Sequence, residues 1–225
     1  MHAYSLDPIQ EQNREKVNRV LFGVSVILTP IFNKLLVWIV RLVQAIPFGE
    51  SVIDWLIDFG FTMSISYIMT YAMLFLLVDR LLWCTLLSKA LAIPNVKGVW
   101  KGTLHSNYNG GKDIDITLII KQTLTKISCV AQFQDSSSSS DMSKLVWING
   151  DEIQLSFAFQ NKSRDLHVAQ KEYHGYNWFL IREGSMRGWY FTDRKLPDGK
   201  TTNGEMELSW VAKKQRTIKS RRGKH

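Results

Sequence analysis

The segment EIQLSFAFQN, residues 152 to 161, places a large apolar side chain at every second position. These side chains belong to Ile153, Leu155, Phe157 and Phe159, with polar or small residues between them. Successive side chains of a β-strand point to opposite faces of a sheet, whereas a helix repeats every three to four residues. The alternation therefore predicts a strand with one buried face and one solvated face.

Short segments of the same kind follow one another along the C-terminal half of the chain. Besides residues 152–161, they are residues 99–106, 114–122, 127–133, 145–149, 177–181, 188–194 and 205–212. Their connections are short, and Asn149-Gly150 and Pro197-Asp198-Gly199 are typical of hairpin turns. This pattern predicts an eight-stranded antiparallel up-and-down β-barrel, with room inside for packed side chains or one small ligand.

The N-terminal part of the chain is apolar in long, continuous runs. Residues 59 to 78 are 20 consecutive positions without a charge, enough for a helix to cross a hydrocarbon layer roughly 30 Å thick. Residues 20 to 40 are nearly as apolar, although they include Pro30, Asn33 and Lys34. We predict a membrane α-helical hairpin of two N-terminal transmembrane helices in front of the all-β barrel.

The distribution of Lys and Arg predicts the orientation of this hairpin. Basic residues precede the first apolar run and follow the second, while the connection between the runs is mainly acidic. Because positive flanks stay in the cytoplasm, both termini of this two-span membrane protein are expected there. The predicted parts are a cytoplasmic segment (1–19), the hairpin (20–80), a linker (81–94), the cytosolic barrel (95–213) and a basic tail (214–225).

The formal net charge of +8 is concentrated in the tail. The last 13 residues contain seven Lys and Arg and no acidic residue. Such a tail is typical of a solvated chain end; the alternative is contact with anionic lipid headgroups, worth about 1 kcal/mol per basic residue. Binding of duplex nucleic acid is not expected, since the rest of the chain carries almost no excess positive charge.

The motifs of common enzyme classes are missing from the sequence. It contains no G-x-S-x-G, H-E-x-x-H or C-x-x-C motif and no phosphate-binding loop. The five histidines and two cysteines do not cluster at the spacing of metal ligands, and Cys84 and Cys129 give no sign of a disulfide framework. We therefore expect a protein that is not an enzyme and that holds no cofactor or metal.

The stretch GWYFTDR, which ends in Asp193 and Arg194, has two different faces if it is a strand. Tyr190, Thr192 and Arg194 share one face, and two large rings share the other. Periodicity does not tell which face is inward, so two interpretations remain open. Either Trp189 and Phe191 fill the core and the polar face is solvated, or the polar face lines a pocket and the two rings pack outward against another element or subunit.

The order of the segments resembles a known family. Two membrane helices precede NVKGVWKGTL, the serine-rich DSSSSSDMS, LSFAFQNKS, HGYNWFLI and MRGWYFTDRKLPDGK. This order is similar to that of the SMODS-associating two-transmembrane, β-strand-rich effectors of bacterial CBASS antiphage defence, and the resemblance covers nearly the whole chain. It implies that a partner cyclic-oligonucleotide synthase makes a cyclic dinucleotide, that the barrel binds it, and that the effector forms a homo-oligomer which disrupts the lipid bilayer and kills the cell.

A cyclic dinucleotide presents two phosphates and two bases, so its site needs cationic or amide donors and aromatic faces. The residues expected to provide these groups are Trp100, Asn161, His174, Tyr190, Thr192 and Arg194. Arg194 is expected to bind a phosphate, and Tyr190 and Trp100 to stack on bases. Thr192 and Asn161 are expected to form hydrogen bonds.

Two questions stay open in the sequence. The serine run, residues 136 to 140, is either a solvated loop or part of a strand whose alternate serines line the pocket.

The function has alternatives as well: a membrane-tethered, lipocalin-like barrel would bind a lipid or another apolar ligand, and a scaffold protein would bind no small molecule.

Overall fold

The structure is a computed structural model that describes residues 1–44, 66–111, 113–148, 151–164, 170–196 and 198–212. The chain divides into two compact units. One unit comprises Met1–Glu11 and Cys84–His225 and contains the strands; the other, Gln12–Trp83, is helical in its described part. The basic tail beyond residue 212 lies outside the described residues.

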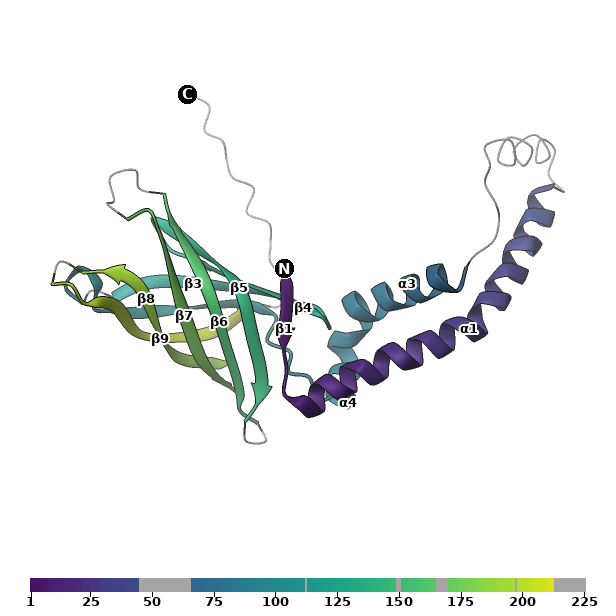
Figure 1. The fold of residues 1–225 in the computed structure, drawn as a ribbon, viewed down its shortest axis with the longest axis horizontal. Coiled ribbons are helices and arrows are strands. Elements are labelled where there is room, and N and C mark those ends of the chain that lie inside the picture. The colour runs from purple at the N-terminus through teal and green to yellow at the C-terminus, as the bar shows by residue number, and fades with distance from the viewer. Residues whose placement is uncertain (45–65, 112, 149–150, 165–169, 197, 213–225) are drawn as a thin grey trace, which may run out of the picture. The chain divides into compact units, whose positions relative to one another are not determined.

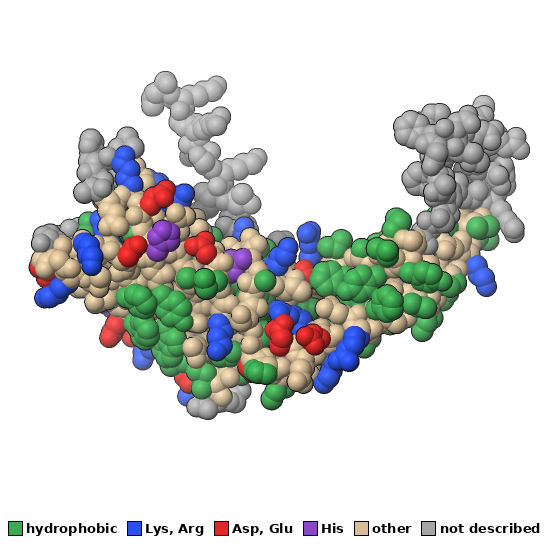
Figure 2. All heavy atoms as spheres, viewed as in Figure 1, with side chains coloured by type: hydrophobic (Ala, Val, Ile, Leu, Met, Phe, Trp, Pro, Cys, Tyr) green, Lys and Arg blue, Asp and Glu red, His purple; other side chains and the backbone are tan. Residues whose placement is uncertain are grey.

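The helices are α1 (Pro8–Gln44), α3 (Tyr67–Leu77), the π-helix η1 (Val78–Leu87) and the short α4 (Ser88–Ala90). Two helical stretches, Pro8–Ile39 and Tyr67–Cys84, are long and apolar enough to cross a membrane. Many of their large apolar side chains are exposed, as Figure 2 shows along the helices. Residues 59–65 of the second predicted span lie outside the described residues.

Helix α1 begins at Pro8, well before the apolar run that starts at residue 20. The Asp7 carboxylate accepts hydrogen bonds from the backbone N–H groups of Ile9 at 2.8 Å and of Gln10 at 3.3 Å. An aspartate in this position satisfies donors that have no partner inside the helix, and proline is favoured at the first helical position. The local sequence at residues 7 and 8 therefore fixes the start of α1.

Eight antiparallel strands form a closed barrel (Figure 1). They are β2 (Gly98–Ser106), β3 (Asp113–Gln122), β4 (Lys126–Gln132), β5 (Ser136–Trp147), β6 (Ile153–Ser163), β7 (Glu172–Arg182), β8 (Ser185–Lys195) and β9 (Thr201–Ala212). Each strand pairs with the next one along the chain, and β9 pairs with β2. The predicted fold class, a helical hairpin and an up-and-down barrel, is confirmed.

A ninth strand, β1 (His2–Ser5), joins the barrel between β4 and β5. It pairs antiparallel with β4 and parallel with β5. These residues belong to the predicted cytoplasmic segment 1–19, for which the sequence indicates no strand. A strand of four residues is too short to show a periodic pattern, so only the tertiary structure reveals it.

The barrel core confirms the alternation of the segment at residues 152–161. Leu155, Phe157 and Phe159 are buried, and the Phe157 ring lies 6.0 Å from the Phe179 ring, centroid to centroid. The serine run is the beginning of strand β5, and its alternate residues Ser138 and Ser140 are buried. The strand interpretation of the serines is therefore the correct one.

A turn connects β8 and β9 at Asp198 and Gly199, where the sequence predicts one; Pro197 lies outside the described residues. The Gly199 N–H donates to the Leu196 carbonyl oxygen at 2.9 Å. Gly199 has a φ of +81°, a backbone conformation that favours glycine. Asn149 and Gly150, the other predicted turn, lie outside the described residues.

Candidate functional site

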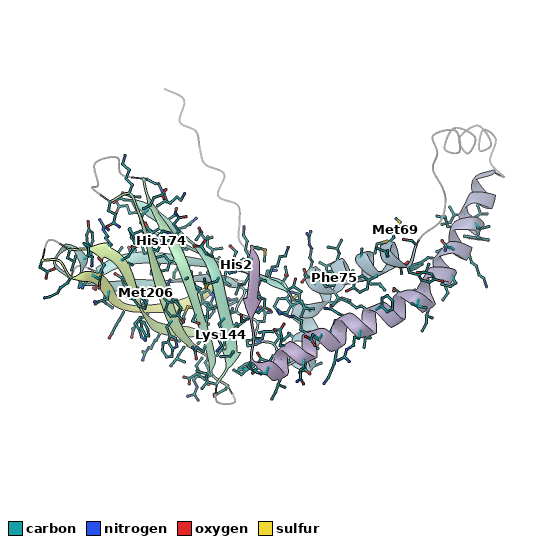
Figure 3. All side chains as sticks on the ribbon, in the orientation of Figure 1. His2, Met69, Phe75, Lys144, His174 and Met206 are labelled. Atoms are coloured by element: carbon teal, nitrogen blue, oxygen red, sulfur yellow. The ribbon has the colours of Figure 1, made fainter. Side chains whose placement is uncertain are left out.

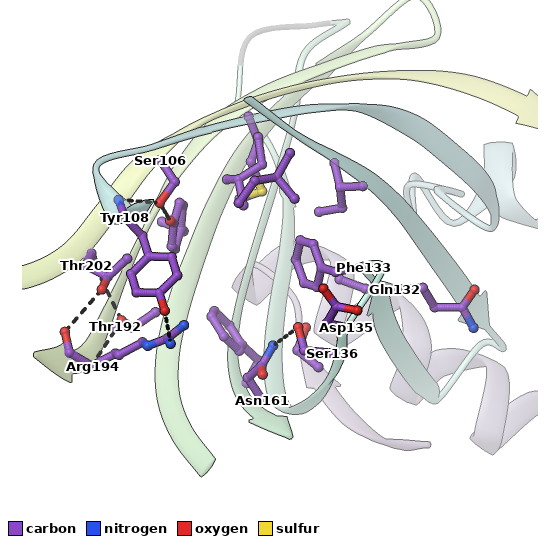
Figure 4. A pocket seen from close by; sticks show the side chains of 18 of the residues that line it. Ser106, Tyr108, Gln132, Phe133, Asp135, Ser136, Asn161, Thr192, Arg194 and Thr202 are labelled. Atoms are coloured by element: carbon purple, nitrogen blue, oxygen red, sulfur yellow. Dashed lines mark hydrogen bonds between the residues drawn. The ribbon is translucent and has the colours of Figure 1, made fainter. Parts of the chain in front are cut away.

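A cavity of about 830 Å³ opens at one end of the barrel. It is lined by the C-terminal ends of β2, β4, β6 and β8 and by the N-terminal ends of β3, β5, β7 and β9. Figure 4 shows the side chains of its wall. Its volume lies in the range of pockets that enclose small organic ligands, roughly 300–1,000 Å³.

The face of β8 that carries Tyr190, Thr192 and Arg194 points into this cavity. Tyr190 is 8% exposed and Thr192 3%, whereas Trp189 is 43% and Phe191 48% exposed. The alternation of the strand therefore places the polar face inside the barrel and the large rings outside. Of the two interpretations that the sequence left open, the structure supports the pocket.

Arg194 is held between two aromatic rings at the mouth of the cavity. Its guanidinium carbon lies 3.7 Å from the centre of the Tyr108 ring and 5.3 Å from that of Tyr173. Its Nη2 donates a hydrogen bond to the Tyr108 hydroxyl (Figure 4). Stacking on aromatic faces leaves the edge of a guanidinium available for further hydrogen bonds. Arg194 is the only Lys or Arg among the described residues that line the cavity.

The hydroxyl of Tyr190 is fixed deeper in the cavity by Ser106. The two hydroxyl oxygens lie 2.6 Å apart, and Ser106 Oγ also accepts a hydrogen bond from the Tyr108 N–H at 3.0 Å. Burial, the main cause, raises the pKa of Tyr190 and also that of Tyr173 above the ordinary tyrosine value. Both phenols are therefore neutral at physiological pH, and each has a proton to donate.

The wall opposite Arg194 consists of small neutral polar groups from β5 and β6. Ser136 and Ser138 line the cavity, and Asn161 Nδ2 donates to Ser136 Oγ at 3.5 Å (Figure 4). Asn161 is 1% exposed, and its Oδ1 has no hydrogen-bond partner among the described residues. An unpaired buried polar atom costs about 1–3 kcal/mol, so such an atom in a cavity wall is a natural contact for a ligand.

Three carboxylates, those of Asp113, Asp115 and Asp135, also line the cavity. They are exposed, and Asp113 Oδ1 lies 2.5 Å from His105 Nδ1. Because these acids repel anions, a phosphate is attracted to the part of the wall near Arg194. The remaining wall suits neutral groups that donate or accept hydrogen bonds.

Two of the predicted site residues do not reach the cavity. Trp100 is buried, and its Nε1 donates to the Val96 carbonyl oxygen at 3.2 Å, which makes it part of the barrel core. The His174 side chain is exposed, and its Nδ1 lies 3.7 Å from Asp193 Oδ2. The structure thus brings together Asn161, Tyr190, Thr192 and Arg194, and it leaves the other two outside.

Sequence reasoning missed Tyr108 and Tyr173. Tyr108 begins the 3₁₀ helix η2 (Tyr108–Gly110) after β2, and Tyr173 lies near the start of β7. Tyr108 follows the last residues of β2, and Tyr173 is one of the first residues of β7. At a strand end, the alternation of apolar and polar residues no longer shows which side chains point inward. Only the closure of the barrel, which brings these strand ends to Arg194, identifies the two rings as parts of the site.

The outer side of β7 and β8 carries four stacked aromatic rings, here called the aromatic face: Tyr176, Trp178, Trp189 and Phe191. The Trp178 and Trp189 rings lie 5.9 Å apart at an interplanar angle of 19°, and the Trp189 and Phe191 rings lie 6.0 Å apart at 22°. An exposed cluster of large rings of this kind often marks an interaction surface.

The chain is similar to one known protein family and to one named protein. Residues 91–209, which include the cavity, match the family model described as "Cap15, cyclic dinucleotide receptor domain". A protein of Escherichia albertii named CD-NTase-associated protein 15 is 27% identical over 154 residues, which cover 65% of this chain and 79% of that protein. The family match covers more than half of the chain.

Proposed function

Because the chain belongs to the family of the Cap15 cyclic dinucleotide receptor domain, we propose that it is a CBASS antiphage effector whose barrel cavity binds one cyclic dinucleotide. One observation supports placing the ligand in this cavity: Arg194 points into it and lies close to the rings of Tyr108 and Tyr173. The proposed activity is that of a receptor, without catalysis. Titration of the full chain with cyclic dinucleotides tests it.

The proposed binding mode follows from the chemistry of the wall. One phosphate replaces the Tyr108 hydroxyl as the hydrogen-bond partner of Arg194, because a guanidinium binds a phosphate with two parallel hydrogen bonds. The hydroxyls of Ser136 and Ser138 across the cavity meet uncharged hydrogen-bonding groups of the ligand. The rings of Tyr108 and Tyr173 provide faces on which the bases stack.

An apolar ligand fits this wall less well. A lipocalin-like barrel needs an interior of aliphatic side chains, and here a guanidinium, hydroxyls and an amide point into the cavity. Against a lipid chain, the buried Asn161 Oδ1 would stay without a hydrogen-bond partner, at a cost of about 1–3 kcal/mol. The wall thus combines these polar groups with apolar and aromatic side chains such as Phe133 and Phe159, and this mixture supports a nucleotide, which has both phosphates and bases.

The helical unit is proposed to anchor the receptor in the bacterial inner membrane with both termini in the cytoplasm. The two long apolar stretches of helix support this placement. Ligand made by a partner nucleotidyltransferase is proposed to drive assembly of several copies, whose membrane helices then disrupt the bilayer. The exposed aromatic face supports a contact between barrels in that assembly.

Replacing both Trp189 and Phe191 with serine is expected to weaken ligand-dependent assembly by about tenfold or more, because large exposed rings provide most of the energy of an interface. Ligand affinity is expected to change less than twofold, since both side chains point away from the cavity. Analytical ultracentrifugation in detergent, with and without a cyclic dinucleotide, measures the assembly. Unchanged assembly of the double variant would exclude this face from the contact.

Replacing Tyr190 with phenylalanine is expected to weaken cyclic dinucleotide binding by about threefold to tenfold. The ring stays in place, but the cavity wall loses a hydroxyl that Ser106 holds at 2.6 Å and that we expect to form one hydrogen bond with the ligand, worth about 0.5–1.5 kcal/mol. Isothermal titration calorimetry measures the change. Unchanged affinity of Tyr190→Phe would mean that this hydroxyl forms no hydrogen bond with the ligand.

A further inference from the structure

Strands β4 and β5 are paired with each other over only part of their length. Residues 130–132 of β4 face residues 137–139 of β5 next to the cavity. Farther from the cavity the two strands separate, and β1 lies between them (Figures 1 and 3). His2 and Ala3 pair with residues of β4, whereas Tyr4 and Ser5 pair with residues of β5.

The residues that bind β1 are also those that would pair with each other if β1 left. The direct register places Val130 opposite Ser139 and Ala131 opposite Ser138. Continued along both strands, this register would place Lys126 opposite Ser143, and these two residues now pair with β1. Insertion of β1 and full pairing of β4 with β5 therefore exclude each other. The pairing gained by β4 and β5 would be antiparallel, which is slightly more stable per residue than the parallel pairing of β1 with β5 that would be lost.

Buried hydrogen bonds hold β1 in place. The Tyr4 hydroxyl lies 3.0 Å from the Leu124 carbonyl oxygen and 3.3 Å from that of Thr123. Gln122 Nε2 donates to the same hydroxyl at 3.3 Å, and His2 Nε2 lies 2.8 Å from Ser140 Oγ. Tyr4 is 3% exposed. The contacts of its side chain are thus the main anchor of the strand.

Gln122 connects β1 with the segment that returns from the second helical stretch. Its Nε2 lies 2.9 Å from the Pro94 carbonyl oxygen, and its Oε1 accepts the Val96 N–H at 3.0 Å. Gln122 is the last residue of β3, at the barrel end opposite the cavity. The chain segments before α1 and after α4 therefore meet at one buried amide, and release of β1 would free the start of α1.

The wall of the cavity and the contacts of β1 share strand β5. Ser136 and Ser138 line the cavity, and two residues farther along the same strand Ser140 contacts His2. Between Ser140 and Met142 the pairing of β5 with β6 shifts its register, at the point where β1 joins. A ligand that pulls Ser136 and Ser138 toward the cavity therefore acts on the place where β4 and β5 separate.

We propose that β1 is a displaceable strand that keeps the receptor inactive: ligand binding extends the pairing of β4 with β5, expels residues 2–5 from the barrel and so releases the start of α1 for assembly. This inference rests on the proposed cyclic dinucleotide binding. It requires by linkage that the ligand binds better when β1 is out, and equally that a fixed β1 weakens ligand binding.

The test fixes β1 with a disulfide in the full chain. Ala3 and Lys126 are exposed antiparallel partners, and the Cα distance of such pairs, about 4.5–5.5 Å, suits a disulfide. The variant A3C/K126C is made together with Cys84→Ser. Cys129 can stay, because burial raises the pKa of its thiol to about 12 and keeps it unreactive. The control disulfide, K101C/S209C, joins the exposed partners of β2 and β9 in the same background.

Binding of a panel of 3′,3′-linked cyclic dinucleotides is measured by calorimetry, and assembly by ultracentrifugation, before and after reduction. Oxidised A3C/K126C is expected to bind about tenfold more weakly than its reduced form and not to assemble. The oxidised control is expected to behave like its reduced form. Equal affinity and assembly in both forms of A3C/K126C would overturn the displaceable strand, while absence of binding by the parent chain would instead reject the proposed function.

A second variant weakens the anchor instead of fixing it. Tyr4→Phe removes the hydroxyl that meets Gln122, Thr123 and Leu124, so it is expected to assemble at about a fifth of the ligand concentration that the parent needs. Hydrogen exchange of the parent is expected to show faster exchange of the amides at residues 2–5 when ligand is added. A Tyr4→Phe protein that needs as much ligand as the parent, or slower exchange at β1 with ligand, would also overturn the proposal.

Discussion

Replacing Arg194 with alanine is expected to weaken cyclic dinucleotide binding by about 100-fold or more. Hydrogen bonds to a charged group contribute about 1.5–3 kcal/mol, and a phosphate left without its cation in a partly buried cavity adds a further penalty. No other Lys or Arg stands among the described residues of the cavity wall to replace it. Calorimetric titration of the purified full chain measures the loss.

Two further variants make the Arg194 result specific. Arg194→Lys keeps the charge but loses the planar pair of donors, so its affinity is expected to fall between those of the parent and the alanine variant. Arg187→Ala is the matched control, because Arg187 lies on the same strand but its side chain is 73% exposed and 3.4 Å from Glu207 Oε1. Equal losses for Arg187→Ala and Arg194→Ala would mean that overall charge, not the cavity, determines binding.

Replacing Gly188 with alanine is expected to lower the free energy of unfolding of the barrel by about 3 kcal/mol. A Cβ at this position would collide with the backbone carbonyl oxygen of Trp178 and with the backbone and ring of Phe179. Strands β7 and β8 are paired there, so the backbone has to move before the methyl group fits, and overpacking of this kind costs about 1–3 kcal/mol or more. Denaturant unfolding followed by tryptophan fluorescence measures the change.

Ser185→Ala is the control for this stability measurement. Ser185 begins the same strand and is exposed, so its replacement is expected to change the unfolding free energy by less than about 0.5 kcal/mol. If Gly188→Ala is as stable as Ser185→Ala, the close approach of β7 and β8 at Gly188 is not a feature of the protein in solution.

The sequence predicted the barrel because its strands have one buried and one solvated face. Leu155, Phe157 and Phe159 are inside, as the alternation in residues 152–161 indicated. The same rule divided the residues of β8 correctly into two faces, but it did not tell which face is inward. The burial of Tyr190 and Thr192 and the exposure of Trp189 answer that question. The family suggested by the order of the segments is confirmed by the match over residues 91–209.

The site residues and the strand that the sequence did not predict depend on contacts between segments that lie far apart in the chain. Tyr108 and Tyr173 become neighbours of Arg194 only because β2 and β8 end, and β7 begins, at the same mouth of the barrel. Trp100 was assigned to the ligand as an aromatic ring, but ring chemistry alone does not distinguish a stacking surface from a core residue. His2 and its neighbours gave no signal at all, since a four-residue strand gains its stability from pairing with β4 and β5.

The central claim, that the barrel cavity is a cyclic dinucleotide receptor, is tested most directly by titrating the full chain in detergent with a panel of cyclic di- and trinucleotides. The full chain is used so that strand β1, to which we assign a regulatory role, is present in the measurement. We predict that a cyclic dinucleotide binds with one molecule per chain and that Arg194→Ala weakens this binding by about 100-fold. Failure of every member of the panel to bind the parent protein, or binding that Arg194→Ala leaves unchanged, would contradict the account.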